Sequence, residues 1–76
     1  MTRKTYRVGV IGAGAIAQAL HLPGYRDAGN CEVVAVADPA EHCIAMCREK
    51  GLPLGTVYAD YRKMIKNEKL DVVSIA

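Results

Sequence analysis

The chain has 76 residues, of which 51% are hydrophobic and 24% are charged, and its formal net charge is +2. This length allows at most one small domain with a thin core, and the composition is that of a globular protein. The weak, evenly spread positive charge argues against nucleic acid as a partner, and no apolar run reaches the roughly 18–20 residues of a membrane span. The N-terminal residues do not fit a secretory signal, so we expect a cytoplasmic protein.

The first half of the chain predicts two strands with helical residues between them. Residues 7–11 read RVGVI, an apolar and β-branched run typical of a strand covered on both faces. A helix is expected over residues 15–20 with a break after Leu20, because proline does not fit a helix interior. A short second helix then begins at Pro23. Residues 32–38, EVVAVAD, predict the second buried strand.

The second half predicts a helix bounded by Pro39 and Gly51, whose acidic first turn and basic last turn match the helix dipole. Three further elements follow: a brief strand or extended loop at residues 56–60, a helix over residues 61–68 capped by Asp60, and an apolar strand at residues 70–76. Strand and helix alternate throughout, which is typical of an α/β fold with right-handed crossovers.

The predicted fold class is therefore α/β, with a parallel sheet of about four strands in the order 3-2-1-4 and helices on both faces. In this order the last strand lies at an edge of the sheet, where its free edge and part of both apolar faces are open. Ordering a chain of this length costs on the order of 100 kcal/mol. We therefore expect these residues alone to form a marginally stable monomer that tends to associate.

The cysteines predict packing and no metal chemistry. Cys43 and Cys47 are four residues apart on a predicted helix, on the same face as Ala40 and Ile44, which makes an apolar stripe. A zinc site needs a spacing such as C-x-x-C with further ligands, so we expect no metal. Three cysteines, an odd number, fit a reducing compartment.

Residues 12–17 read GAGAIA and lie between the first predicted strand and the helix that follows it. This is the G-x-G-x-x-A form of the dinucleotide-binding fingerprint. Gly12 allows the sharp exit from the strand, Gly14 lets a pyrophosphate approach the backbone, and Ala17 allows helix and strand to pack closely. The cofactor-binding residues predicted on this turn are Gly12, Ala13, Gly14, Ala15 and Ile16, the last two through N–H groups at the helix N-terminus.

Asp38 ends the second predicted strand, about 20 positions beyond the fingerprint. An acidic residue at this place accepts hydrogen bonds from the adenosine ribose hydroxyls. The same carboxylate repels a 2′-phosphate, and residues 39–42 include no arginine or lysine, so NAD is favoured over NADP. The alternative is a glycine turn followed by a chance carboxylate that caps the next helix.

Four side chains are candidates for acid–base chemistry: His21, His42, Tyr58 and Tyr61. Neither histidine has a carboxylate partner at a fixed spacing, so each predicts a packing or surface role. The two tyrosines flank Asp60 and are expected to pack the turn there. No residue of the chain is predicted to be catalytic.

The segments RVGVIGAGAIAQALHLPGY, VVAVADPA, YADYRKMI and LDVVSIA, in this order, resemble the N-terminal segment of the glucose–fructose oxidoreductase / inositol 2-dehydrogenase family (Gfo/Idh/MocA). The resemblance covers almost the whole chain after Thr5. It implies a partial Rossmann fold in which residues 1–76 are the N-terminal part of an NAD(P)-binding domain, cut after the fourth strand. Ala76 would then lie at the strand end that lines the cofactor crevice.

Members of this family are NAD(P)-dependent oxidoreductases, mostly acting on sugars, cyclitols and related hydroxy compounds, with a second domain that often forms the oligomer interface. The resemblance therefore implies a small-molecule substrate and a homo-oligomer for the complete protein. The family's Thr-Pro-x-x-x-His loop and its Glu-Lys-Pro motif, whose lysine is catalytic, are not present up to Ala76. We expect the cofactor-binding part of an oxidoreductase that is not catalytic alone; a noncatalytic nucleotide-binding module or a nonfunctional fragment is the alternative.

Overall fold

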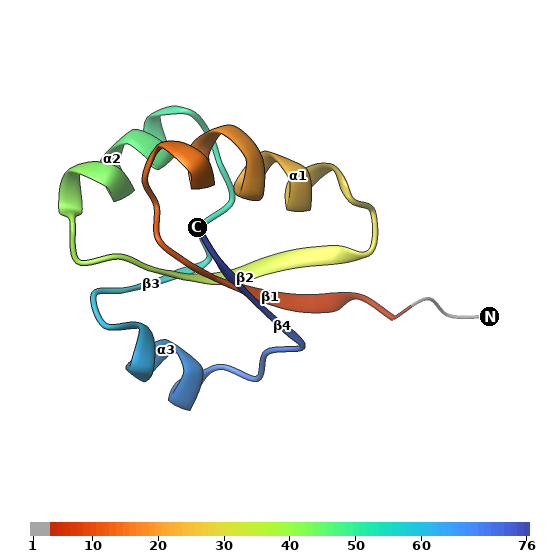
Figure 1. Cartoon of the computed structure of the whole chain (residues 1–76). Coiled ribbons are helices and arrows are strands. Elements are labelled where there is room, and N and C mark those ends of the chain that lie inside the picture. Colours follow the sequence, from red (N-terminus) through yellow and green to blue (C-terminus); the bar gives the residue numbers. More distant parts are fainter. Residues whose placement is uncertain (1–3) are drawn as a thin grey trace.

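Four parallel strands form the centre of the molecule, as the computed structural model of residues 4–76 shows (Figure 1). The strands are β1 (Tyr6–Ile11), β2 (Cys31–Ala37), β3 (Thr56–Tyr58) and β4 (Val72–Ile75). They lie in the order β3-β2-β1-β4, and every neighbouring pair is parallel. The structure therefore confirms the predicted strand order, with β4 at an edge.

Helices cover both faces of the sheet, as predicted. Helices α1 (Leu22–Asp27) and α2 (Glu41–Glu49) lie on one face, and α3 (Tyr61–Asn67) lies on the other (Figure 1). The larger core lies beneath α1 and α2, and its fully buried side chains include those of Val8, Val10, Leu22 and Cys47. The smaller core lies between α3 and the sheet and consists of Ala35 and Ala37 from β2 and Met64 from α3. Burial of these apolar side chains on both faces holds the layers together.

Gly9 lets α3 and the segment after it approach the sheet closely. Side chains alternate between the faces of a strand, so Val8 and Val10 point to one core and position 9 points to the other. A Cβ atom at Gly9 would lie 2.6 Å from Leu70 Cδ1 and 3.1 Å from Met64 Cε. The missing side chain at this strand position therefore makes room for the smaller core.

The expected helix break after Leu20 is wrong. Helical structure runs without interruption from residue 15 to residue 27 and includes the π-helical turn η1 (Ala17–His21). The Leu22 N–H donates to the Ala17 carbonyl, five residues earlier, in place of the usual four. Pro23 follows directly in the first turn of α1 and has no N–H to donate to the preceding helical turn. The wider turn thus lets the chain pass the proline without ending the helix.

The helix expected from Pro39 begins two residues later, at Glu41. The backbone at Ala40 is extended, and its N–H donates to the Asp38 carboxylate, so the helical conformation starts only after this contact. Two other predicted helix signals are confirmed. Gly51 follows α2 with a φ of 67°, and Asp60 caps α3 by accepting a 2.9 Å hydrogen bond from the Arg62 N–H.

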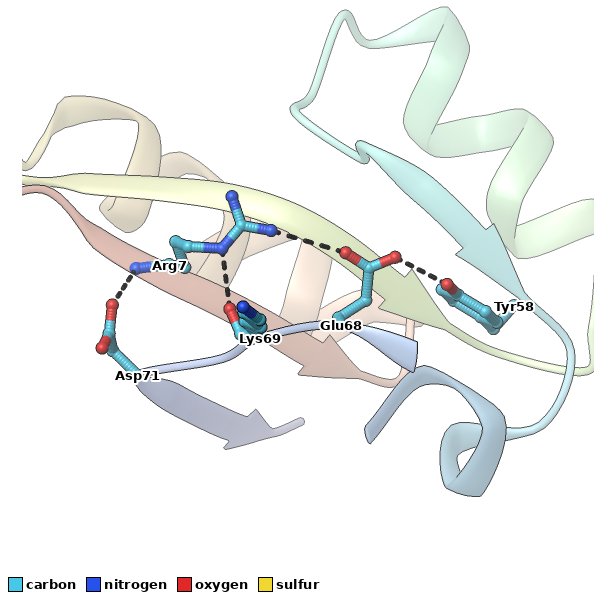
Figure 2. A network of polar contacts seen from close by, with 5 residues as sticks. All are labelled: Arg7, Tyr58, Glu68, Lys69 and Asp71. Carbon is cyan, nitrogen blue, oxygen red and sulfur yellow. Dashed lines mark hydrogen bonds and ion pairs between the residues drawn. The ribbon is translucent and has the colours of Figure 1, made fainter. Parts of the chain in front are cut away.

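A polar network fastens the segment between α3 and β4 to the sheet (Figure 2). Arg7 donates through Nε to the Lys69 carbonyl at 2.7 Å and lies 3.6 Å from a Glu68 carboxylate oxygen. The other oxygen of Glu68 accepts a 2.6 Å hydrogen bond from the Tyr58 hydroxyl. The Arg7 backbone N–H also donates to the Asp71 carboxylate, and the Asp71 backbone N–H donates to the Arg7 carbonyl. The network links β1, β3 and the start of β4.

Candidate functional site

The turn after β1 requires glycine at position 12 for two reasons. Gly12 has a φ of 103°, a conformation that other residues rarely adopt. A Cβ atom at this position would also lie 2.9 Å from the Ala76 carbonyl oxygen. The Gly12 N–H donates to the Ala37 carbonyl at 2.8 Å, and the Ala76 N–H donates to the Ile11 carbonyl at 2.9 Å. Gly12 therefore lies between the carboxyl ends of β2 and β4.

Gly14 differs from Gly12 because the fold itself gives no reason for a glycine there. Its φ is not positive, and a Cβ atom at this position would have no neighbour within 4 Å. The first residue with regular helical hydrogen bonding is Gln18, whose N–H donates to the Gly14 carbonyl at 3.0 Å. The bare backbone at Gly14 is thus open to a molecule outside the chain.

Three consecutive backbone N–H groups lie free at this helix start. Within residues 4–76, the N–H groups of Gly14, Ala15 and Ile16 donate to no acceptor. Such groups at a helix N-terminus bear a partial positive charge and bind anions. The side chain of Ile16 is 54% exposed, so solvent reaches this end of the helix. The arrangement can hold a phosphate group against bare backbone.

The Asp38 carboxylate joins the end of β2 to the glycine turn. Its Oδ2 accepts from the Ala13 N–H at 2.7 Å, and its Oδ1 accepts from the Ala40 N–H at 2.7 Å. Both are short, charge-assisted hydrogen bonds that fix the carboxyl plane. Each carboxylate oxygen keeps a second lone pair with which it can accept from a ligand hydroxyl.

A cleft of about 390 Å³ lies over the carboxyl ends of β1, β2 and β3. Its lining residues are Ile11, Gly12, Ala37, Asp38, Pro39, Ala59, Asp60 and Tyr61. The volume lies within the roughly 300–1,000 Å³ of small-molecule sites, and ligands of open α/β sheets bind outside the carboxyl ends of the strands. The cleft, the free N–H groups and the Asp38 carboxylate thus adjoin one another at this edge of the sheet.

The structure divides the predicted site residues into three groups. Gly12 and Asp38 line the cleft. Gly14, Ala15 and Ile16 form the helix start beside it. The backbone N–H groups of the remaining two donate to other parts of the protein. Ala13 is fully buried and its N–H donates to Asp38, whereas the Ala76 N–H donates to the Ile11 carbonyl beside Gly12.

The acid–base candidates are dispersed over the molecule. His21 Nδ1 lies 2.7 Å from the Ser74 hydroxyl and ties η1 to β4. His42 Nε2 lies 3.5 Å from the Cys43 sulfur on α2. The hydrogen bond to Glu68 raises the pKa of the Tyr58 phenol, which lies in the network of Figure 2. Tyr61 is 48% exposed and lines the cleft. The sequence predicted that it packs against the turn at Asp60.

The cysteines pack as predicted. The Cys47 side chain is fully buried in the larger core, and Cys43 packs against the same core. Burial raises the pKa of the Cys47 thiol, and the neighbouring Cys43 adds to this effect. The protonated thiol lies 3.6 Å from the Ala13 carbonyl oxygen and can donate to it. Among residues 4–76, no three His, Cys, Asp or Glu side chains are grouped as metal ligands require.

Two polar residues that support the glycine turn, Gln18 in η1 and Lys50 after α2, were not predicted from the sequence. Gln18 follows the fingerprint directly, is only 8% exposed and donates to the Ala13 carbonyl at 2.9 Å. Lys50 at the end of α2 donates to the Gln18 side-chain oxygen at 2.7 Å. A glutamine on an otherwise apolar helix face was a local indication for Gln18. Nothing in the sequence connects it with a lysine 32 residues away.

The strand order, the glycine turn and the cleft at the carboxyl ends define a nucleotide-binding domain of the Rossmann type. A family-wide sequence model described as "Oxidoreductase family, NAD-binding Rossmann fold" (GFO_IDH_MocA) matches residues 6–76. The chain belongs to this family. No curated protein matches the chain, and no helix within residues 4–76 has the length and apolar character needed to cross a membrane.

Solved structures of dehydrogenases share the fold. The scyllo-inositol dehydrogenase from Lactobacillus casei superposes with a TM-score of 0.83 at 22% identity over 100% of this chain. The WlbA dehydrogenase from Bordetella pertussis, in complex with NADH and UDP-GlcNAcA, gives 0.80 at 19% identity over 100% of this chain. The myo-inositol 2-dehydrogenase from Lactobacillus plantarum gives 0.76 at 25% identity over 96%. The chain spans 22%, 22% and 21% of these three proteins, respectively.

Proposed function

We propose that the turn at residues 12–16 and the adjoining cleft bind NAD. The observation that supports this most directly is Gly14, which has open space around it and adjoins free N–H groups. The pyrophosphate would accept hydrogen bonds from the N–H groups of Gly14, Ala15 and Ile16. The Asp38 carboxylate would accept from the adenosine ribose hydroxyls, and the adenine would lie in the cleft against Tyr61.

The same geometry favours NAD over NADP. A 2′-phosphate would lie beside the negatively charged Asp38, which is held in place by its two backbone hydrogen bonds. Among residues 4–76, no lysine or arginine lines this cleft to compensate the charge. Two negative charges about 4 Å apart repel each other by roughly 1 kcal/mol in bulk water and by roughly 4 kcal/mol near a protein surface.

The chain would supply the cofactor-binding part of a larger oxidoreductase. We propose that residues 1–76 are the N-terminal part of a Rossmann domain, since the chain spans about a fifth of the dehydrogenases that share its fold. When bound, NAD would supply the hydride acceptor for the oxidation of a hydroxyl group. The substrate would be a sugar, a cyclitol or a related hydroxy compound, in keeping with the two inositol dehydrogenases. The base that takes the hydroxyl proton would come from residues outside these 76. The complete protein would be a homo-oligomer in the cytoplasm.

A titration with NADH tests the cofactor site. The variant Gly14→Ala places a methyl group where the pyrophosphate would approach, so its dissociation constant for NADH should rise about tenfold or more, or about 1.4 kcal/mol. Its stability should be unchanged or higher by about 0.4–1 kcal/mol, because alanine restricts the unfolded chain. Gly24→Ala is the matched control, since a Cβ there also meets nothing within 4 Å and the residue lies on α1. Equal NADH affinity of Gly14→Ala and the wild type would contradict the proposed site.

A noncatalytic nucleotide-binding module is the second candidate. In such a module the cleft and the free N–H groups of residues 14–16 would bind a nucleotide without a reaction. The intact mass of the protein from its native source separates the two candidates. A mass near 8.2 kDa supports the binding module. A mass several times larger supports the oxidoreductase.

A further inference from the structure

The peptide group between Ala13 and Gly14 is held by side chains from two other parts of the fold. The Ala13 carbonyl accepts a 2.9 Å hydrogen bond from Gln18 Nε2, and the Cys47 sulfur lies 3.6 Å from the same oxygen. On the preceding peptide, the Ala13 N–H donates to Asp38. Residues from η1, from α2 and from the end of β2 therefore converge on a single residue of the glycine turn.

Gln18 is suited to this contact because its amide is buried and both of its ends are paired. It is the only buried polar side chain within residues 4–76, and its Oε1 accepts a 2.7 Å hydrogen bond from Lys50 Nζ. The Ala13 carbonyl can only accept and the Lys50 ammonium can only donate. These two partners leave one orientation for the Gln18 amide, with Nε2 toward the turn and Oε1 toward the lysine.

The contact to the Ala13 carbonyl also sets the direction of the Gly14 N–H. These two groups belong to one planar trans peptide, in which C=O and N–H point in opposite directions. The carbonyl points inward to Gln18 and Cys47, so the N–H points outward, where it has no acceptor within the described residues. A rotation of this peptide would turn the N–H away and present the carbonyl oxygen to an anion.

We propose that Gln18, oriented by Lys50, is a positioning residue that holds the Gly14 N–H toward a bound pyrophosphate. The proposal rests on the proposed function, because it assigns to these residues the preparation of the same site. Gln18 and Lys50 act through the Ala13–Gly14 peptide and need not touch the ligand. An interaction prepared before binding strengthens the complex because less order has to be created on association.

Two nucleotide probes separate positioning from general stability. ADP contains the pyrophosphate, and adenosine lacks it. In Gln18→Met, which keeps the length of the side chain without its hydrogen bonds, the dissociation constant for ADP should rise about three- to tenfold, the effect of one lost hydrogen bond. The dissociation constant for adenosine should change less than about twofold. Titrations followed by NMR measure both constants, and Lys66→Met, an exposed lysine on α3, is the control.

Lys50 provides a second, independent variant. It is exposed at the end of α2, so Lys50→Met should fold even if Gln18→Met does not. Lys50→Met should weaken ADP binding selectively, and Lys50→Arg, which keeps a donor for Gln18 Oε1, should restore it. Equal losses for ADP and adenosine, or no loss for ADP in either variant, would overturn the proposal. If the wild type binds neither NADH nor ADP, the proposed function itself fails.

Discussion

Asp38→Asn tests how the turn and the strand end depend on one carboxylate. Asparagine keeps the shape of the side chain but has one acceptor oxygen, whereas Asp38 accepts from both the Ala13 N–H and the Ala40 N–H at 2.7 Å. The amide NH₂ would then face one of these donors. One charge-assisted hydrogen bond is lost, which costs about 1.5–3 kcal/mol. Because Asp38 is half-buried, we expect the lower half of this range.

Thermal and chemical unfolding measure this loss. For a domain of this size, 1 kcal/mol corresponds to a shift in Tm of about 4–8 °C. Asp27→Asn is the matched control, because the Asp27 side chain is 73% exposed and, among residues 4–76, pairs only with the neighbouring Arg26. Its free energy of unfolding should change by less than about 0.5 kcal/mol. If both variants melt at the wild-type temperature, the carboxylate of Asp38 does not hold the turn.

The same variant tests cofactor preference. Removing the negative charge of Asp38 removes its repulsion of a 2′-phosphate, so the preference for NADH over NADPH should fall about tenfold or more. Titration of both cofactors with wild type, Asp38→Asn and Asp27→Asn gives the ratio of dissociation constants. An unchanged ratio in Asp38→Asn would show that the carboxylate does not face the ribose.

Two further predictions follow from the cleft and from the network at β1. Tyr61→Ala should weaken NADH binding about three- to thirtyfold, because the aromatic ring lines the cleft. Tyr61→Phe keeps the ring and should bind NADH like the wild type. If Tyr61→Ala binds NADH as tightly as the wild type, the ring does not contact the adenine. The Arg7 backbone N–H and the Lys4 ammonium hold the pKa of Asp71 below its usual value of 3.8. The ionised Asp71 carboxylate therefore stabilises the fold above about pH 4, and this stabilisation is lost as the pH falls through the lower pKa of the folded state. Urea unfolding between about pH 2 and pH 6 should therefore show a shallower acid loss of stability in Asp71→Asn than in the wild type, and parallel curves would contradict this.

Local patterns in the sequence were sufficient for the elements of the fold. The apolar runs at β1 and β2 predicted buried strands, the run at β4 predicted an apolar edge strand, and the alternation of strand and helix predicted a parallel sheet with helices on both faces. Gly51 and Asp60 marked helix ends correctly, because a positive φ and a capping carboxylate are properties of single residues. The helix break expected after Leu20 was wrong. Whether a proline ends a helix or follows a widened turn depends on the hydrogen bonds of the preceding residues.

The candidate site was predictable in part for the same reason. The fingerprint spacing placed Gly12 directly after β1 and Asp38 directly after β2, since strand ends and turns are defined by neighbours in the chain. The contrast between Gly12 and Gly14 was not visible, because the Ala76 carbonyl that crowds Gly12 is brought there by β4. Only the packed molecule separates a glycine required by the fold from one that leaves open space.

What the sequence by itself determined is thus the set of elements, their order in an α/β sheet and the backbone turn that follows β1. The tertiary structure decided which side chains meet at that turn. Gln18 reaches Lys50 across 32 residues, and His21 reaches Ser74 across 53. Tyr61 comes to the cleft because β3 lies beside β2. Each of these contacts depends on strand order and helix packing, which bring residues distant in the chain within hydrogen-bonding distance, whereas secondary structure follows from periodicity over a few residues.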